Sequence, residues 1–174
     1  TRERTPNYKM AASKTSPNAF ENAEVVSDLG LKGETAKIVE RNKAIEERII
    51  REGETDADGN VMASTRMQQE LARNNLPRAF ALARQAAGKG NDLTLEEGLK
   101  MNDVSEWFGE YSLKLTELAR TYRPIVKDKD GNLKRIPFGA YMNSLLPRKY
   151  SGILNRLKSK VQASSMAEET TAKE

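Results

Sequence analysis

Apolar residues recur at helical spacing in the first well-patterned stretch of the chain, residues 35–52. Ile38, Ile45 and Ile49 fall on one stripe, and Gly53 follows where a helix C-terminus favours left-handed backbone geometry. The stripe is narrow, as in a helix that packs against one partner. This stretch is therefore predicted to be an amphipathic helix.

Three shorter stretches follow and extend the helical pattern. Residues 64–74 carry isolated apolar positions among polar ones, and residues 75–88 have a broad apolar face that ends at two closely spaced glycines. Residues 92–102 carry three leucines. The pattern predicts helices over the first two stretches and a short helix or turn over the third.

The longest helix is predicted over residues 103–122, and Pro124 follows it. The residue before a proline is pushed out of the α region, which places the helix end close to residue 122. For Trp107, the only tryptophan, a core position is favoured over a ligand-binding platform. The stripe consists of Val104, Trp107, Phe108, Tyr111, Leu115, Leu118, Ala119 and Tyr122.

Two further helical patterns surround Pro147, which either kinks one helix or begins the next. The pattern before the proline starts at Phe138 and includes Tyr141. The pattern after it keeps apolar residues on one face, from Tyr150 to Val161, and basic residues on the other. No segment shows a persuasive alternation of period two, so the expected fold class is all-α.

Two acidic, glycine-containing pentapeptides, residues 56–60 and 128–132, superficially resemble calcium loops. A calcium loop needs glycine at position six and a bidentate glutamate at position twelve. With Gly59 at position six, Thr65 falls at twelve; with Gly131 at six, Pro137 falls there. Both pentapeptides are interpreted as tight turns.

The polarity of the chain ends suggests four regions. We expect an extended polar N-terminal segment over residues 1–33, a helical arm over residues 34–71, a compact helical bundle over residues 72–161 and an extended polar C-terminal tail over residues 162–174. The first of these cannot bury enough apolar surface to offset its ordering entropy, so an external partner is expected to hold it.

Charge is distributed unevenly. Residues 120–160 hold eleven Lys or Arg against two Asp, nine net positive charges, whereas the whole chain carries +4. Such a block indicates a polyanion or an acidic protein face as partner, or else a solvated basic surface. The expected binding residues are Arg148, Lys149, Arg156, Lys158, Lys160, Lys134, Arg135 and Tyr150.

Cysteine and histidine are both absent, which excludes disulfides and Cys/His metal sites and removes the usual general base near neutral pH. No phosphate-binding loop or carboxylate pair is visible either. We therefore expect a protein that is not an enzyme and that needs no metal and no cofactor. There is no apolar run near the length of a membrane span and no secretory signal, so a protein that is neither membrane-bound nor secreted is expected.

Several short motifs in residues 72–160 resemble the second conserved region of bacterial sigma factors. They are Asn75-Leu-Pro-Arg-Ala-Phe-Ala-Leu-Ala-Arg, Leu118-Ala-Arg-Thr-Tyr-Arg-Pro124 and Pro137-Phe-Gly-Ala-Tyr141, with a Gly131 turn between the last two. They are also similar to degenerate segments of large phage virion and polyvalent proteins. The resemblance implies a compact helical bundle like the core-binding region of sigma factors. Its structural core would be formed by Trp107, Phe108, Tyr111, Tyr122, Phe138 and Tyr141.

In the sigma family the same region also melts promoter DNA with aromatic side chains and binds phosphates with basic ones. Here Ser144 and Leu145 stand where the family places its melting aromatics, and Pro147 interrupts the following helix. Tyr150 is the only nearby aromatic residue that could stack on a base. The departures favour a sigma-like scaffold used for binding over a factor that opens promoters.

These observations lead to two functional expectations. The first is a non-catalytic structural or interaction component of a phage particle, which contacts other virion proteins within a larger assembly. The alternative is a phage sigma-like transcription factor that binds the RNA polymerase core and DNA in the host cytoplasm. DNA is a candidate partner in both cases.

Overall fold

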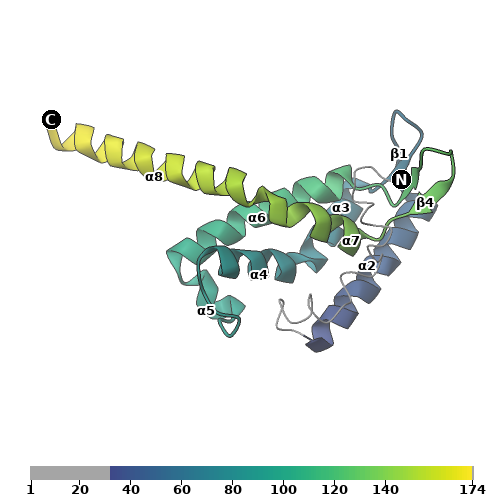
Figure 1. Ribbon diagram of the computed structural model, residues 1–174, viewed down its shortest axis with the longest axis horizontal. Helices are drawn as coiled ribbons and strands as arrows, with labels where there is room; N and C mark the ends of the chain where they lie inside the picture. The colour runs from purple at the N-terminus through teal and green to yellow at the C-terminus, as the bar shows by residue number, and fades with distance from the viewer. Residues whose placement is uncertain (1–31, 174) are drawn as a thin grey trace.

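The computed structural model describes the backbone of residues 32–173 and the side chains of residues 35–163. Within that range the chain is mostly helical (Figure 1). The expected N-terminal segment 1–33 lies almost wholly outside the described residues. In chain order the elements are α2 (Lys32–Glu52), β1 (Glu54–Thr55), β2 (Val61–Met62), α3 (Thr65–Asn74), α4 (Leu76–Ala86), α5 (Leu95–Leu99), α6 (Asn102–Thr121), β3 (Ile125–Lys127), β4 (Leu133–Arg135), α7 (Phe138–Leu145), the 3₁₀ helix η2 (Leu146–Lys149) and α8 (Tyr150–Lys173).

Two short antiparallel hairpins interrupt the helices of residues 32–173, and they correct the expectation of an all-α chain. β1 pairs with β2 through two residues on each strand, and β3 pairs with β4 through three. Strands this short offer no room for a visible alternation of apolar and polar residues, which is why the sequence pattern did not reveal them. A mostly helical fold is the description that holds.

The hairpin turns are the two acidic pentapeptides, and their interpretation as tight turns is confirmed. In each turn the first aspartate, Asp56 or Asp128, accepts hydrogen bonds at 2.9 Å through Oδ1 from the backbone N–H groups two and four residues further on. Gly59 and Gly131 adopt φ angles of 84° and 82°, in the left-handed region that glycine enters without steric cost. The same five-residue turn conformation therefore closes both hairpins.

An ion pair ties the first hairpin to the link between α6 and β3. Arg123 follows α6 and precedes β3, and its Nε donates to Asp56 Oδ2 in the first hairpin turn at 2.7 Å. This bond and those from the backbone hold the pKa of Asp56 below its usual range. Both hairpins lie at the same end of the molecule (Figure 1).

The aromatic stripe of α6 forms the centre of the core. Trp107, Tyr111 and Tyr122 are buried, as is Phe138 at the start of α7. Tyr122 lies edge-on to Phe138 with ring centroids 5.0 Å apart, and its hydroxyl donates to the backbone carbonyl of Ile136. The core position predicted for Trp107 is confirmed. Phe108 and Tyr141, also expected in the core, are half-buried and pack against it.

Buried amides hold α2 to the junction between α3 and α4. Asn42 and Asn75 exchange side-chain hydrogen bonds of 3.0 and 2.7 Å, and both are almost fully buried. Asn74 adds two more, to Asn42 Oδ1 at 2.9 Å and to the carbonyl of Ile38 at 3.0 Å. Because the pairing satisfies the amides of Asn42 and Asn75, α2 is fixed in one register against α3.

Glu46 on α2 is a buried carboxylate that anchors the start of α7. Its Oε2 accepts a hydrogen bond from the backbone N–H of Phe138 at 2.8 Å, and Oε1 lies 3.4 Å from Nη2 of Arg135. Burial raises the pKa of Glu46, and the bonds from Phe138 and Arg135 offset only part of that effect. Glu46 thus connects α2 to the β3–β4 hairpin and α7.

The raised pKa of Glu46 predicts a pH-dependent stability. The folded protein keeps the Glu46 proton at pH values where the unfolded chain has released it, so this contribution to stability is lost as pH rises through the folded pKa. The free energy of unfolding of wild type, relative to Glu46→Gln, should therefore fall between acidic and neutral pH. Urea unfolding of both proteins across that range measures the difference, and a difference that grows with pH would contradict the assignment.

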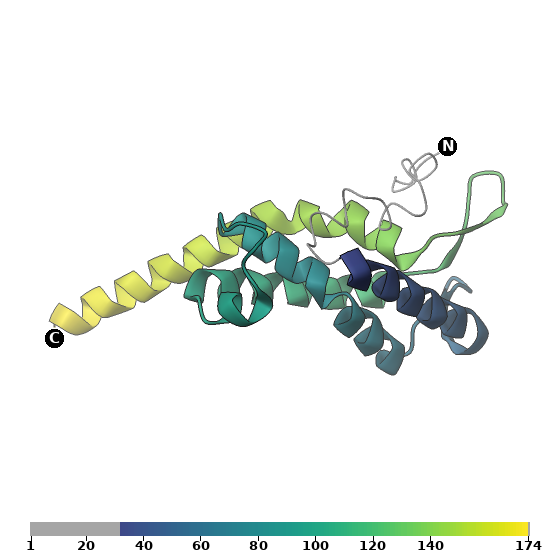
Figure 2. The ribbon, with the colours of Figure 1, turned by 90° about the horizontal axis from the view of Figure 1, so that it is seen from below.

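The last helix leaves the helical body. Ile153 is buried and Leu157 packs against the core, but every residue from 158 to 163 is exposed. Figures 1 and 2 show the distal part of α8 extending away from the other helices. Helical backbone continues to Lys173, whereas the sequence pattern placed the end of this helix near Val161.

Candidate functional site

Residues 146–163, named here the cationic segment, comprise η2 and the first part of α8. Leu146 and Ile153 are 0% and 1% exposed and anchor the segment on the core. Pro147 lies in the 3₁₀ turn that separates α7 from α8, so it begins a new helical element, one of its two predicted roles. The anchoring leaves the charged side chains on the outside.

The cationic segment contains five basic residues and no acidic one. Arg148, Lys158 and Lys160 are exposed and Lys149 is half-exposed. None of these four forms an ion pair within the part of the chain that the structure describes. From Lys149 to Lys160 the segment spans about 16 Å at about 1.5 Å per residue.

The fifth basic residue, Arg156, has a different role. Its Nε donates to Glu110 Oε2 at 3.1 Å, and the Glu110 side chain is 9% exposed. Leaving a carboxylate buried without its partner is costly, so Arg156 serves to fasten α8 to α6. It was predicted as a binding residue; its side chain is 63% exposed, but its guanidinium is engaged with Glu110.

An aromatic stack lies at the start of the segment. The Tyr150 ring is nearly parallel to that of Trp107, with centroids 5.2 Å apart, and Trp107 in turn stacks on Tyr111 at 6.0 Å. Tyr150 remains 43% exposed. Beside the stack is a cavity of about 280 Å³, lined by Leu82, Gln85, Ala86, Tyr111, Pro147 and Tyr150.

The predicted binding residues fall in two places. Arg148, Lys149, Tyr150, Lys158 and Lys160 belong to the cationic segment, but Lys134 and Arg135 lie on β4 at the other end of the molecule (Figure 1). Arg135 is engaged with Glu46. The sequence block of positive charge is therefore not one surface in the fold.

Sequence reasoning missed the acidic partners. Glu110 lies inside the apolar stripe of α6, and Glu46 lies on the stripe that carries Ile45 and Ile49. A charged residue at a core-facing position is the signal that could have identified each of them as a buried ion-pair member.

Comparison with protein-family models, with curated proteins and with solved structures gave no match to this chain. In residues 32–173 no helix combines the length and apolar character needed to cross a bilayer. Among residues 35–163, whose side chains the structure describes, no group of three acidic side chains is placed to bind a metal ion.

Proposed function

We propose that this protein is a non-catalytic component of a larger, nucleic-acid-containing assembly and that it contacts nucleic acid through the cationic segment. The observation that carries the proposal is the run of five cations without an acidic residue, four of them unpaired among the described residues. A phage particle, which the sequence resemblance implies, is the assembly we propose.

Nucleic acid accounts for two features together. Unpaired lysines and arginines spread along an exposed helix suit a chain of phosphates, which binds such side chains with release of counterions. The half-exposed Tyr150 ring, which stacks on Trp107, offers a stacking platform next to Arg148 and Lys149. An acidic protein surface would use the charges but would leave the aromatic platform without a role.

Neutralising the segment tests the proposal. The variant R148Q/K149Q/K158Q/K160Q should bind a short fluorescent single-stranded DNA about tenfold or more weakly than wild type at low salt, because it loses phosphate contacts. Fluorescence anisotropy measures the affinity. Circular dichroism should show an unchanged helix content, since all four side chains lie at the surface.

A matched control removes the same charge elsewhere. In R120Q/K127Q/K129Q/K134Q the neutralised residues lie at the end of α6 and on the β3–β4 hairpin, away from α8. Its affinity should change by less than about threefold, because charges beyond a Debye length are screened. Equal losses in the two variants, or no loss in the first, would refute a site on the cationic segment.

A further inference from the structure

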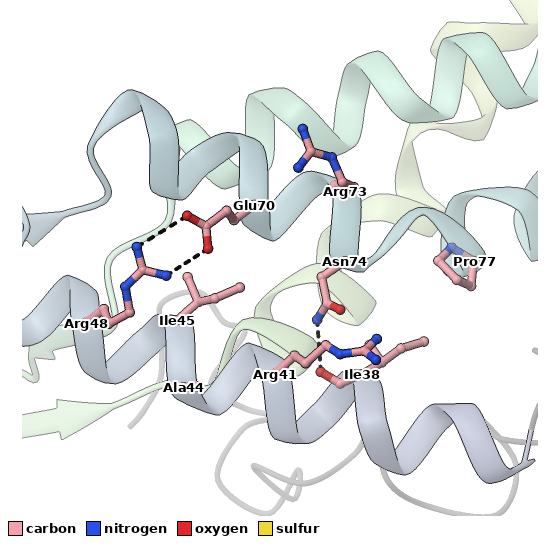
Figure 3. A pocket seen from close by; sticks show the side chains of 9 residues that line it. All are labelled: Ile38, Arg41, Ala44, Ile45, Arg48, Glu70, Arg73, Asn74 and Pro77. Atoms are coloured by element: carbon pink, nitrogen blue, oxygen red, sulfur yellow. Dashed lines mark hydrogen bonds and ion pairs between the residues drawn. The ribbon is translucent and has the colours of Figure 1, made fainter.

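A second charged feature lies between α2 and α3, on the far side of the molecule from the projecting part of α8. It is a groove of about 510 Å³, named here the α2–α3 groove (Figure 3). Ile38 and Ile45, 3% and 7% exposed, contribute apolar surface to it, and Pro77 of α4 lines it as well. The groove therefore offers an aliphatic floor for an apolar side chain.

Three arginines surround this floor. Arg48 of α2 forms a bidentate pair with Glu70 of α3 through bonds of 2.7 and 3.2 Å, drawn as dashed lines in Figure 3. Arg41 and Arg73 are exposed and form no ion pair among the side chains of residues 35–163. Three arginines against one glutamate leave the groove with two net positive charges. Its lining holds no aromatic ring, so bases would find nothing to stack on.

The distal part of α8 needs a partner on physical grounds. Residues 158–163, the last ones whose side chains are described, are all exposed, and Val161 is 64% exposed. Most helical stability in proteins comes from tertiary packing, which residues 158–163 lack. The segment 164–174 contains three glutamates, Glu168, Glu169 and Glu174, against a single lysine, so its net charge of −2 is opposite to that of the groove. The same segment contains the apolar residue Met166.

We propose that the α2–α3 groove receives segment 164–174 of a second copy of this chain, so that copies join head to tail. Carboxylates of the incoming segment pair with Arg41 and Arg73, and its methionine covers the aliphatic floor. The segment cannot reach the groove of its own copy, because α8 points away from α2 in both views (Figures 1 and 2). Such a contact is heterologous and propagates from copy to copy.

Analytical ultracentrifugation of the nucleic-acid-free protein tests this contact independently of DNA binding. Wild type should associate as its concentration rises, and R41E/R73E and E168K/E169K should each dissociate about tenfold or more easily, because each places like charges opposite one another. The control K37E/K43E makes the same charge change on exposed positions of α2 outside the groove and should associate like wild type.

Mixing the two defective variants gives the sharpest result. One retains the segment and the other retains the groove, and the two reversed surfaces are again opposite in charge, so an equimolar mixture should associate at concentrations where neither variant associates alone. A wild type that stays monomeric into the near-millimolar range would overturn the proposal. Undiminished association of R41E/R73E would also overturn it, because that result requires a contact outside the groove, such as α8 against α8.

Discussion

Replacing Leu115 with alanine is expected to lower the free energy of unfolding by about 2–5 kcal/mol, the range found for leucines removed from well-packed cores. Leu115 lies in the middle of α6 and is 0% exposed. Both α3 and α4 pack against α6, so the lost side chain leaves a cavity that several elements would have to move to fill. A loss of this size is a large share of the stability of an ordinary domain.

Leu113 provides the matched control on the same helix. It is two residues away and 57% exposed, so Leu113→Ala should change the free energy of unfolding by no more than about 0.5 kcal/mol. Both substitutions replace leucine with alanine inside the same helix, so the change in helix propensity cancels and burial is the main difference between them. Urea unfolding followed by circular dichroism measures both values. Similar losses at the two positions would mean that α6 does not pack as described.

The second large effect is expected at Asn75. Asn75→Ala should cost about 2–4 kcal/mol, because it removes two hydrogen bonds with Asn42 and leaves the Asn42 side-chain N–H group buried without its acceptor. The bond from Asn75 Nδ2 to the carbonyl of Leu71, 2.7 Å long, is lost as well. The substitution should therefore loosen the attachment of α2 to the α3–α4 junction.

A double-mutant cycle with Asn42→Ala isolates the amide pair. Once one partner is absent, removing the other should cost less. The loss of stability in the double variant should therefore be smaller than the sum of the two single losses by about 1–3 kcal/mol. Denaturant unfolding of the four proteins supplies the cycle. Additive losses would show that the two amides contribute separately and that the reciprocal pair does not stabilise the fold.

The helices were predictable from the sequence where the apolar stripe is wide and regular. α6 presents aromatic and aliphatic residues at i, i+3, i+4 and i+7 over its whole length, and Ser64 caps α3 at its predicted start through a bond from the N–H of Met67. Both features depend only on residues that are close together in the sequence, so they can be recognised before the tertiary contacts are known.

Long-range partners were not predictable, because spacing along the chain says little about which distant residues meet. Arg156 and Glu110 are 46 residues apart, and Arg135 and Glu46 are 89 apart. The sequence marked Arg156 and Arg135 only as members of a basic block. Burial of their acidic partners turns both arginines into structural residues.

Only the part of the candidate site that is continuous in the sequence could be predicted. The cationic segment is continuous in sequence, so a count of charges located it. The β3–β4 hairpin lies in the same charge block but at the opposite end of the fold (Figure 1). The α2–α3 groove had no sequence signal, because its arginines come from two helices and combine only when those helices pack together.

The salt dependence of DNA binding tests the central claim, a phosphate contact by the cationic segment, most directly. The logarithm of the binding constant of wild type should fall linearly with the logarithm of salt concentration. The slope should be steeper by about 3 than that of R148Q/K149Q/K158Q/K160Q, because each of the four lost phosphate contacts on a single strand contributes about 0.7. Equal slopes for the two proteins would show that these four residues release no counterions and would contradict the account.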